Sequence, residues 1–564
     1  MTLSIVAIAL VAGTALGIGS YGIRVARTTS DLFVASRAVT PWWNAAAISG
    51  EYLSAASFLG IAGLEMKLGA AALWLPIRFT GGYLALLLFV AAPLRRIGAY
   101  TIADFAEARL QSPGLRMVAA VAALLIAGFY LVPQLKGAGL TLSEVTGGPY
   151  FAGVLGVAVL VALSVGLGGM RGVTYVQAFQ YWVKLFAIAL PACILLIHLG
   201  GLPAKAALFG DELPSAPAGG LTVVLDEPVT VTFPEATAFL LDEQPQAAEA
   251  GERHTLPAGT LELGAGSAVP VADGIEPERG AQWSEPVADD GPASPLLVYS
   301  LLVATFLGTM GLPHILVRFY TNPDGPAARR TTVRVLGLLG LFYLFPVAYG
   351  MLGRVMVPEL YITGETDVVV LRLPEAAWPG LGGEILAAIV AAGAFAAFMS
   401  TASGLLVSVA GTLSFDLVGR RRVRPADRRR WFRLAAAAGM VLPAAAALAA
   451  RDLDISLLVG WAFALAASTF CPLLLLGVWW TGLTARGAGT GMAVGAGVAT
   501  AGIVVGLALD VDDADVVGAL LTQPALISVP LAFATMVLVS RAGQRGVHHG
   551  EAELAAAHIP EGLR

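Results

Sequence analysis

Adjacent hydroxyl side chains interrupt an apolar segment late in the sequence. Ser400 and Thr401 lie within AAFMSTASGLLVSVAG, residues 396–411, which is otherwise apolar apart from Ser403 and Ser408. Sodium is a hard cation that needs several oxygen ligands, and inside a membrane these come from hydroxyls and from the carbonyls of unwound backbone. The pair could therefore supply part of a sodium site, or each hydroxyl could bond to a carbonyl of its own helix. The spacing alone favours neither interpretation.

Two other apolar segments contain residues that break helices. The first has the sequence WWNAAAISGEYLSAASFLGIAG, and we expect its helix to break around Ser49 and Gly50. The second has the sequence LLVATFLGTMGLPHILVRF, and we expect its helix to break at Gly308, Gly311 and Pro313. Pro313 has no N–H and crowds the preceding turn, so nearby backbone groups need partners outside their own helix. Glycines could also serve only for close helix packing. Two breaks at corresponding positions favour a secondary transporter with its site near the middle of the membrane.

Charged and polar side chains near these breaks are candidates for substrate binding. Glu51 lies in the first broken segment and Arg78 in the next apolar segment. A buried guanidinium is costly unless it is paired, so Arg78 is expected to pair with Glu51, the favoured interpretation, or to receive a substrate carboxylate. A half-helix beginning near Gly311 would be a second source of positive potential. Gln134 is expected to face the cavity, whereas His314 is either a cavity residue or a structural histidine with satisfied hydrogen bonds.

The composition places these segments in an integral membrane protein. The 564 residues are 57% hydrophobic and 13% charged, unlike an ordinary soluble domain. Apolar runs of about 20 residues, each long enough to span a bilayer as a helix, recur along the chain. We predict an all-α polytopic membrane protein with thirteen transmembrane helices. The expected spans are 1–22, 41–63, 70–94, 114–139, 148–168, 174–199, 294–318, 331–357, 383–416, 430–450, 454–480, 487–509 and 523–541.

Basic residues follow every odd-numbered span, whereas the intervening loops are short or acidic. The positive-inside rule then places the N-terminus outside and the C-terminus in the cytoplasm. Only four of the 34 basic residues are lysines, which suggests a GC-rich bacterial genome. We therefore expect a multi-pass protein of the bacterial cytoplasmic membrane, in contact with lipid, whose first span is a retained anchor because no basic residue precedes it.

A long acidic segment, residues 200–293, falls on the outer side. It is rich in proline and glycine and contains the alternating stretch LTVVLDEPVTVTF, which is typical of β-strands. We expect a small extracytoplasmic lid or a partly disordered insertion, with a solvated spacer as the favoured interpretation. The expected units are an extra helix and cytoplasmic loop (1–40), a first five-helix repeat (41–199), the acidic insertion (200–293), a second five-helix repeat (294–480), and two accessory helices with a cytoplasmic tail (481–564).

Four motifs together resemble the sodium–solute symporters, and among them the branch that carries acetate and other short-chain monocarboxylates. The motifs are EYLSAASFLGIAG from Glu51, GGMR from Gly168, GLPHILVRF from Gly311 and STASGLL from Ser400. The resemblance implies a LeuT-type 5+5 inverted repeat with broken helices 2 and 7. It also implies sodium-coupled uptake, by alternating access, of a small organic anion such as acetate, propionate or pyruvate.

The resemblance further implies roles for individual residues. Sodium (Na⁺), the coupling ion, would be bound by the carbonyls of Ala45, Ile48 and Ala397 and by the hydroxyls of Ser400 and Thr401. Gln177 stands where sugar-transporting relatives carry an aspartate, so the exit path of the ion is expected to differ. The substrate-binding candidates, from the resemblance and from the residues themselves, are Ser49, Gly50, Glu51, Arg78, Gln134, Gly308, Thr309, Gly311 and His314.

Spacing alone makes a further prediction for the helix that contains Gln177. Gln177, Gln180 and Lys184 share one of its faces, which predicts a polar seam directed into the bundle. Lys136, near the outer end of another helix, is expected to extend to the membrane interface.

Several other functions are compatible with the sequence. Glu51 could take up a proton, which would make the chain a proton-coupled carrier, and the solute could instead be proline or pantothenate. A membrane sensor that keeps a transporter fold is the rival from another class, and an ion channel is a weaker one. The sequence contains no nucleophile elbow, metal-binding cluster or phosphate-binding loop, so we expect neither an enzyme nor a nucleic-acid partner. The oligomeric state is left open.

Overall fold

The structure, a computed structural model, describes most of the chain. The described residues are 2–25, 39–97, 99–203, 205–276, 278–286, 293–417, 427–509, 516–543, 554–555 and 558–559. The segments 26–38, 418–426 and 510–515, on whose charges the predicted orientation partly depends, lie outside the described residues.

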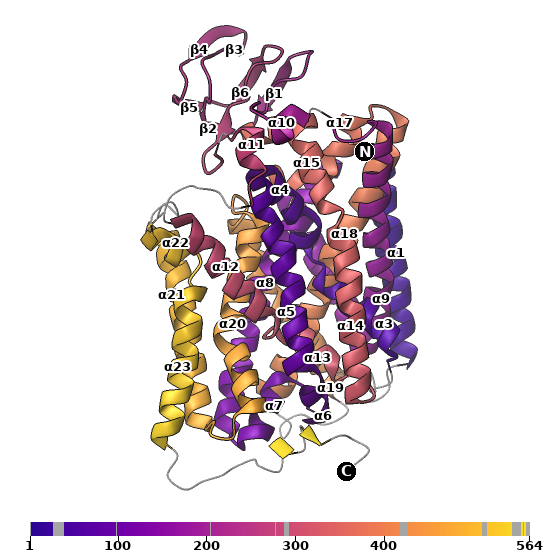
Figure 1. The fold of residues 1–564 in the computed structure, drawn as a ribbon. Helices are drawn as coiled ribbons and strands as arrows, with labels where there is room; N and C mark the ends of the chain where they lie inside the picture. Colours follow the sequence, from indigo (N-terminus) through magenta and orange to yellow (C-terminus); the bar gives the residue numbers. More distant parts are fainter. Residues whose placement is uncertain are drawn as a thin grey trace.

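The fold is a long helical bundle with a small β-rich unit at one end (Figure 1). The bundle opens with α1 (Thr2–Val25). The first repeat then contains α3 (Pro41–Tyr52), the π-helix η2 (Ala56–Gly60), α4 (Ile61–Leu68), α5 (Trp74–Phe89), α8 (Pro113–Thr146) and α9 (Tyr150–His198). The second contains α12 (Ala293–Thr309), α13 (Pro313–Phe319), α14 (Gly325–Tyr343), α15 (Pro346–Met356), α18 (Leu381–Gly411), α19 (Arg428–Ala449) and α20 (Ile455–Trp479), and α21 (Ala485–Leu509) and α23 (Ala525–Gly543) close the bundle.

Shorter helices connect these elements. At the end of the bundle opposite the β-rich unit lie α6 (Ala91–Ile97) and α7 (Ile102–Leu110) (Figure 1). The others are η3 (Gly69–Leu73), α10 (Lys205–Phe209), α11 (Gly280–Trp283), α16 (Glu359–Thr363), η4 (Thr366–Val368), α17 (Val369–Ala377), η5 (Thr412–Leu417) and α22 (Val516–Thr522).

The described residues contain twelve continuous helical stretches that are long and apolar enough to cross a membrane. The prediction of thirteen spans differs because α3 is only 12 residues long and because the stretch from Ala56 to Phe89 contains both α4 and α5, which are separated at Gly69, where φ is 54°. Taking α3, η2 and α4 as one broken pass and α5 as the next gives the predicted count. The two broken passes begin the two groups of five passes.

The helix α9 holds two of these spans, Tyr150–Leu167 and Gly172–His198. A Cβ atom on Gly19 of α1 would lie 3.8 Å from the Ser164 hydroxyl and 3.9 Å from a methyl group of Val176. In a straight helix, residues twelve positions apart are separated by about 18 Å along the axis. The chain therefore turns back on itself between Ser164 and Val176, where the sequence predicted a turn.

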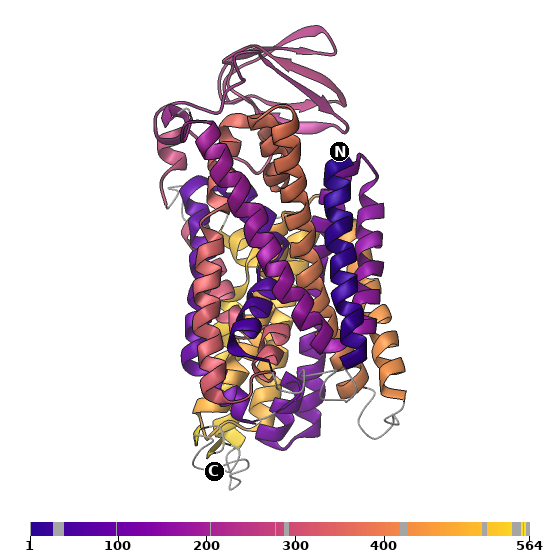
Figure 2. The same cartoon turned by 90° about the vertical axis from the view of Figure 1, so that its right-hand side faces the viewer.

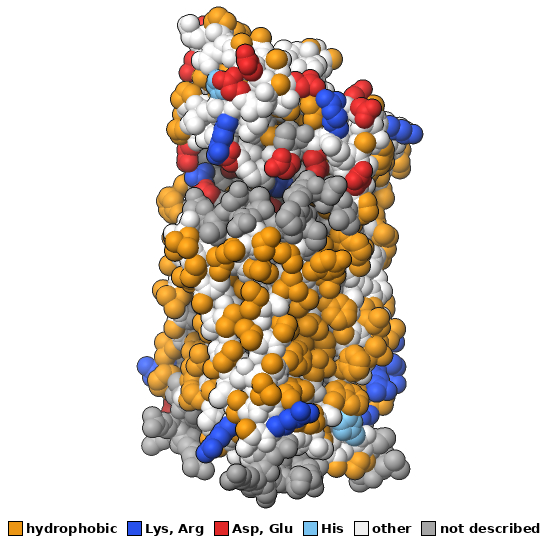
Figure 3. Space-filling model, turned by 60° about the vertical axis from the view of Figure 1, so that its left-hand side comes forward, with side chains coloured by type: hydrophobic (Ala, Val, Ile, Leu, Met, Phe, Trp, Pro, Cys, Tyr) orange, Lys and Arg blue, Asp and Glu red, His pale blue; other side chains and the backbone are white. Residues whose placement is uncertain are grey.

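The central helices of the bundle are α18 and α20, in which nearly every side chain is buried. Their sequences are apolar on all sides, as expected for helices surrounded by other helices. Figure 3 shows an outer belt of apolar side chains that separates acidic and basic residues at one end from basic residues at the other. This belt is the surface that a lipid bilayer would cover.

The insertion between the repeats folds into strands (Figure 2). One antiparallel sheet has the order β1-β6-β3-β4 and a second has the order β5-β2-β7. The alternating stretch forms β1 (Leu221–Leu225) and β2 (Val229–Thr232), as its pattern predicted. The remaining strands are β3 (Thr237–Leu241), β4 (Gln244–Ala248), β5 (Arg253–Leu256), β6 (Gly259–Leu263) and β7 (Val271–Ala272).

The β-rich unit has a small core of its own. Val231, Phe233 and Leu261 are fully buried, and Phe233 stacks on Phe239 with ring centroids 5.0 Å apart. The described part of the insertion is therefore folded, unlike the partly disordered insertion that the sequence also allowed. The unit lies at the same end of the bundle as the start of α1 (Figure 1), which agrees with the predicted alternation of the passes. Which end faces the cytoplasm remains a prediction.

Candidate functional site

The first broken pass breaks later than the sequence suggested. Ser49 and Gly50 lie inside α3, which ends at Tyr52, and the chain leaves helical geometry at Leu53 before η2 begins at Ala56. Contrary to the expectation, Gly50 does not break the helix; a Cβ at this position would clash with the backbone carbonyl of Gln177 on α9. Gly50 therefore allows α3 and α9 to pack closely, and the break follows three residues later.

The second broken pass breaks where the sequence predicted. The helix α12 ends at Thr309, and Pro313 occupies the first turn of α13, where its missing N–H costs nothing. Gly308 and Gly311 both face α20: a Cβ on Gly308 would lie 2.5 Å from the carbonyl oxygen of Phe463, and one on Gly311 would clash with that of Ala466. The glycines hold the broken pass against the central helix.

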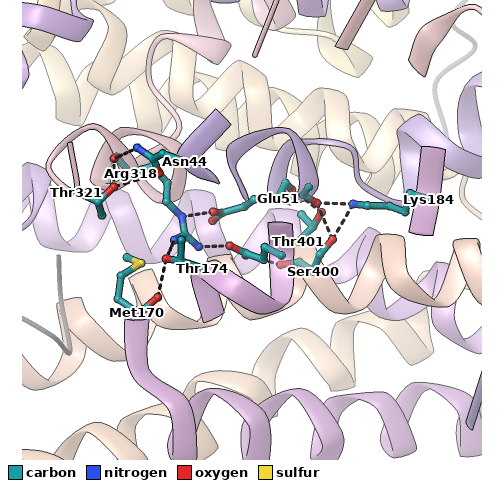
Figure 4. Close-up of polar contacts among 11 residues, drawn as sticks. Asn44, Glu51, Met170, Thr174, Lys184, Arg318, Thr321, Ser400 and Thr401 are labelled. Carbon is teal, nitrogen blue, oxygen red and sulfur yellow. Dashed lines mark hydrogen bonds and ion pairs between the residues drawn. The ribbon is translucent and has the colours of Figure 1, made fainter. Parts of the chain in front are cut away.

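The hydroxyls of Ser400 and Thr401 bond across to the broken end of α3 (Figure 4). The Ser400 hydroxyl lies 2.7 Å from the carbonyl oxygen of Gly50 and 2.9 Å from that of Ala397 in its own helix. The Thr401 hydroxyl donates to the carbonyl of Glu51 at 2.5 Å. The last carbonyls of a helix have no partner within it, so α18 supplies the hydrogen bonds that the break in α3 leaves unmade.

A lysine also binds at this junction between the end of α3 and α18. The ammonium group of Lys184, on α9, donates to the carbonyl oxygen of Leu53 at 2.7 Å, to the Ser400 hydroxyl at 2.8 Å and to the carbonyl of Gly50. An ammonium group has three N–H donors, and all three find an oxygen here. Lys184, Gln177 and Gln180 are fully buried, which confirms the polar seam predicted on this face of α9. The sequence did not reveal that Lys184 reaches α3 and α18.

The residues present do not fit a sodium ion beside this lysine. Ala397, Ser400 and Thr401 on α18 do lie close to the end of α3, and Ala45 and Ile48 are buried within α3. However, the Ser400 hydroxyl already accepts from the Lys184 ammonium, whereas the Thr401 hydroxyl donates to the carbonyl of Glu51. Two unit charges about 4 Å apart repel each other by about 4 kcal/mol at an effective dielectric constant of about 20. A second cation would therefore be repelled by Lys184 and would compete with it for the Ser400 hydroxyl.

The expected pair between Arg78 and Glu51 is not formed. Glu51 pairs instead with Arg318 of α13, whose Nε lies 2.6 Å from the Glu51 Oε2 (Figure 4). Both side chains are almost completely buried. The prediction was wrong because Arg318, although present in the GLPHILVRF motif, lies at the far end of its pass and offered no local sign of its partner.

Two side chains of α9 extend this ion pair into a network. Arg318 donates to the Thr174 hydroxyl at 2.6 Å and to the side-chain oxygen of Gln177. The amide nitrogen of Gln177 donates to the carbonyl oxygen of Ser400 at 2.8 Å. The network therefore joins both broken passes to α9 and α18, and with all groups ionised it contains the cations Arg318 and Lys184 and the single carboxylate of Glu51.

Polar contacts also tie the two breaks together. The hydroxyls of Tyr52, before the first break, and Thr309, before the second, lie 2.9 Å apart. The side-chain oxygen of Gln134 accepts from the backbone N–H of Ala55 at 3.0 Å, so this amide satisfies the backbone just after the first break. Gln134 and Thr309 are therefore brought to the breaks, as the sequence suggested.

Three candidate side chains are buried with polar atoms that have no hydrogen-bond partner among the described residues. These atoms are Nε and NH1 of Arg78, both ring nitrogens of His314, and the Ser49 hydroxyl. The His314 ring meets the edge of the Tyr130 ring at a centroid distance of 5.4 Å. His314 is thus not the fully hydrogen-bonded structural histidine that the sequence also allowed.

A cavity of about 1050 Å³ lies between the β-rich unit and the helices. Lys136, expected at the interface, lines it and donates to the carbonyl of Leu453, with Asp367 3.9 Å away. Burial raises the pKa of Asp367 above its ordinary value, and the nearby charge of Lys136 opposes that change. Lys67 and Asp454 form a second ion pair on the same wall, at 3.1 Å.

Comparison with known proteins agrees with this architecture. The chain is 31% identical over 545 residues to the uncharacterized symporter YwcA of Bacillus subtilis, with 94% of this chain and 93% of that protein covered. It is 31% identical over 574 residues to an uncharacterized symporter of Cupriavidus necator, with 85% and 82% covered.

A solved structure shares the fold. The substrate-bound, outward-open structure of a Na⁺-coupled sialic acid symporter superimposes with a TM-score of 0.66 at 13% identity, with 96% of this chain and 98% of that one covered. The fold is therefore the LeuT-type inverted repeat of secondary transporters. A model of the Sodium:solute symporter family matches residues 32–211 and 260–495, which is most of the chain. On these grounds the chain belongs to the sodium:solute symporter family, whose members are transporters and not enzymes.

Proposed function

We propose that this symporter carries a small monocarboxylate, such as acetate, propionate or pyruvate, into the cell together with a cation. Membership of the family supports symport by alternating access, in which the two repeats expose the site to each side of the membrane in turn. The solute and the ion are our proposal. The single observation that carries the choice of an anionic solute is the buried guanidinium of Arg78, whose Nε and NH1 have no hydrogen-bond partner among the described residues.

Arg78 has the position and the free donors that a carboxylate needs. Its side chain is 4% exposed, and its Nε and NH1 atoms have no partner among the described residues. One turn further along α5, Gly82 packs against Thr309, which is the last residue before the second break. A guanidinium binds a carboxylate through two parallel hydrogen bonds, and such a charge inside a membrane is costly until it is paired.

The surroundings of the breaks favour a small solute. The Tyr52 ring meets the edges of Tyr83 at 4.7 Å, Phe79 at 5.8 Å and Phe463 at 6.3 Å between centroids. These aromatic side chains fill the space beside the first break. A two- or three-carbon acid needs less rearrangement of these rings than a sugar would.

The cation gradient supplies the driving force. Sodium is the ion that the family's description implies, and a proton is the alternative. One charge that crosses a potential of 100 mV gains about 2.3 kcal/mol. A monovalent carboxylate that enters with one monovalent cation carries no net charge, so that transport would depend on the ion concentration gradient and not on the voltage.

Uptake by purified protein in liposomes tests this function. Labelled acetate, propionate and pyruvate are compared with proline and pantothenate under an inward gradient of both sodium and protons. We expect concentrative uptake of the monocarboxylates, lost when both gradients are dissipated, and a much weaker apparent affinity in Arg78→Met. The exposed arginine Arg330 provides a matched control, Arg330→Met, in which affinity is unchanged. If only proline or pantothenate were taken up, the assignment of a monocarboxylate would be wrong. If no solute were taken up, the result would favour a sensor.

A further inference from the structure

We propose that the ammonium group of Lys184 takes the place of a sodium ion between α3 and α18. The inference rests on the proposed function, because it concerns the ion that accompanies the solute. It departs from the sodium coupling that the family's description implies. The reason lies in the contacts of one side chain.

The ammonium group binds the same kind of oxygen cage that a sodium ion requires. Its acceptors are two carbonyls at the broken end of α3, those of Gly50 and Leu53, and one hydroxyl on α18, that of Ser400. A sodium ion at this depth would draw on carbonyls of unwound backbone and on hydroxyls. The resemblance to the family assigns Ser400 to sodium as well. In this chain Lys184 therefore binds a hydroxyl of α18 and carbonyls of α3, the two helices from which the sodium ligands were expected.

The packing of α9 makes Lys184 a fixed part of the junction. A Cβ on Gly50 would clash with α9 on one side, and a Cβ on Gly393 of α18 would clash with Ala187, one turn beyond Lys184, on the other. The Tyr181 hydroxyl, one turn before Lys184, donates to the carbonyl of Leu338 on α14 at 3.0 Å. The two glycines thus allow α9 to approach closely enough for the ammonium group to reach both helices.

The charged neighbours of Lys184 pair with each other. They are Glu51 on α3 and Arg318 on α13, 2.6 Å apart. The ammonium group is therefore held by the uncharged oxygens of Gly50, Leu53 and Ser400, as a sodium ion would be.

Ion replacement in the wild-type protein is the first test. Uptake of labelled acetate into liposomes is measured with an imposed inward proton gradient, in sodium salts and in potassium salts. We expect the same uptake in both salts. Uptake that requires sodium while the proton gradient is maintained would overturn the inference and leave the proposed symport intact.

Lys184→Ala provides the second test, with a readout that does not depend on transport. Removal of the ammonium group leaves an oxygen-lined space between α3 and α18, so we expect the melting temperature of the variant to rise in NaCl relative to KCl. The wild type and Lys136→Met, which also lacks a buried ammonium group, should show no such difference. A sodium-specific rise in the wild type would contradict the inference. If no carboxylate is transported, the proposed function fails, whereas this thermal comparison still decides the role of Lys184.

Discussion

The carboxylate of Glu51 and the guanidinium of Arg318 lie 2.6 Å apart, although 267 residues separate them in the sequence. One belongs to the first broken pass and the other to the second. Because the two passes begin the two repeats, this ion pair joins the repeats at their corresponding elements. Its neighbours Thr174 and Gln177 on α9 bind the same guanidinium.

Glu51→Gln should strongly destabilise the protein, because it leaves Arg318 as an uncompensated buried charge. Breaking a buried ion pair from one side costs about 3–5 kcal/mol. Thermal unfolding in detergent measures the change. The matched control is Glu227→Gln, which breaks the exposed pair of Arg451 and Glu227 at 3.2 Å. Exposed pairs contribute about 0–1 kcal/mol, so equal effects of the two substitutions would contradict the assigned ion pair.

Thr401→Val should destabilise the junction between α18 and α3. Valine has nearly the same shape as threonine but cannot donate to the carbonyl of Glu51, which the Thr401 hydroxyl now contacts at 2.5 Å. A buried carbonyl without a partner costs about 1–3 kcal/mol. Thr401→Ser keeps the hydroxyl and should retain most of the stability in the same unfolding measurement. If valine were tolerated better than serine, packing and not the hydrogen bond would hold this contact.

Gly50→Ala should abolish transport or folding, because the added Cβ would clash with the carbonyl of Gln177. The backbone on both sides of this contact is helical and cannot shift without moving α3 from α9. Expression level, monodispersity in detergent and uptake together measure the effect. Gly337→Ala on α14, where a Cβ meets nothing within 4 Å, is the control. It should be neutral or stabilising by about 0.5–1 kcal/mol, since alanine is the better helix former.

The β-rich unit should be removable without loss of the membrane fold. The backbone N–H of Ala216 donates to Ser267 at 2.8 Å, and that of Gly266 donates back to Ala216 at 3.0 Å, so the two ends of the unit are adjacent. Replacement of residues 217–265 by two glycines therefore needs no rearrangement of the helices. We expect unchanged monodispersity and retained uptake. Loss of uptake in a folded variant would show that the unit takes part in transport.

Local sequence signals predicted both broken passes but gave the correct position of only the second break. Pro313, with Gly308 and Gly311, marks the second break in the sequence itself, because proline interrupts a helix whatever surrounds it. The first break, at Leu53 to Ala55, contains neither proline nor glycine, and contacts from other helices define it: Thr401 and Lys184 bind the carbonyls before it, and Gln134 binds the N–H after it. Such contacts depend on the tertiary fold, so a single sequence could not reveal them.

The face of a helix on which a residue lies could be predicted from the sequence, whereas a long-range ion pair could not. The period of Gln177, Gln180 and Lys184 correctly predicted a buried polar face, because the position of a residue on a helix follows from its number. The ion-pair partner of Glu51, in contrast, cannot be inferred from the position of Glu51 in the sequence. Arg78 lies in the next apolar span, which made it the expected partner, whereas the structure places Arg318 beside Glu51.

Entry of radioactive sodium, driven by unlabelled substrate, tests the central claim most directly. Liposomes that contain the wild-type protein are given a saturating monocarboxylate that has already been shown to be transported, and sodium entry is compared with and without it. If the Lys184 ammonium replaces the ion between α3 and α18, the substrate should not increase sodium entry. Substrate-stimulated sodium entry that persists in Lys136→Met would contradict the account.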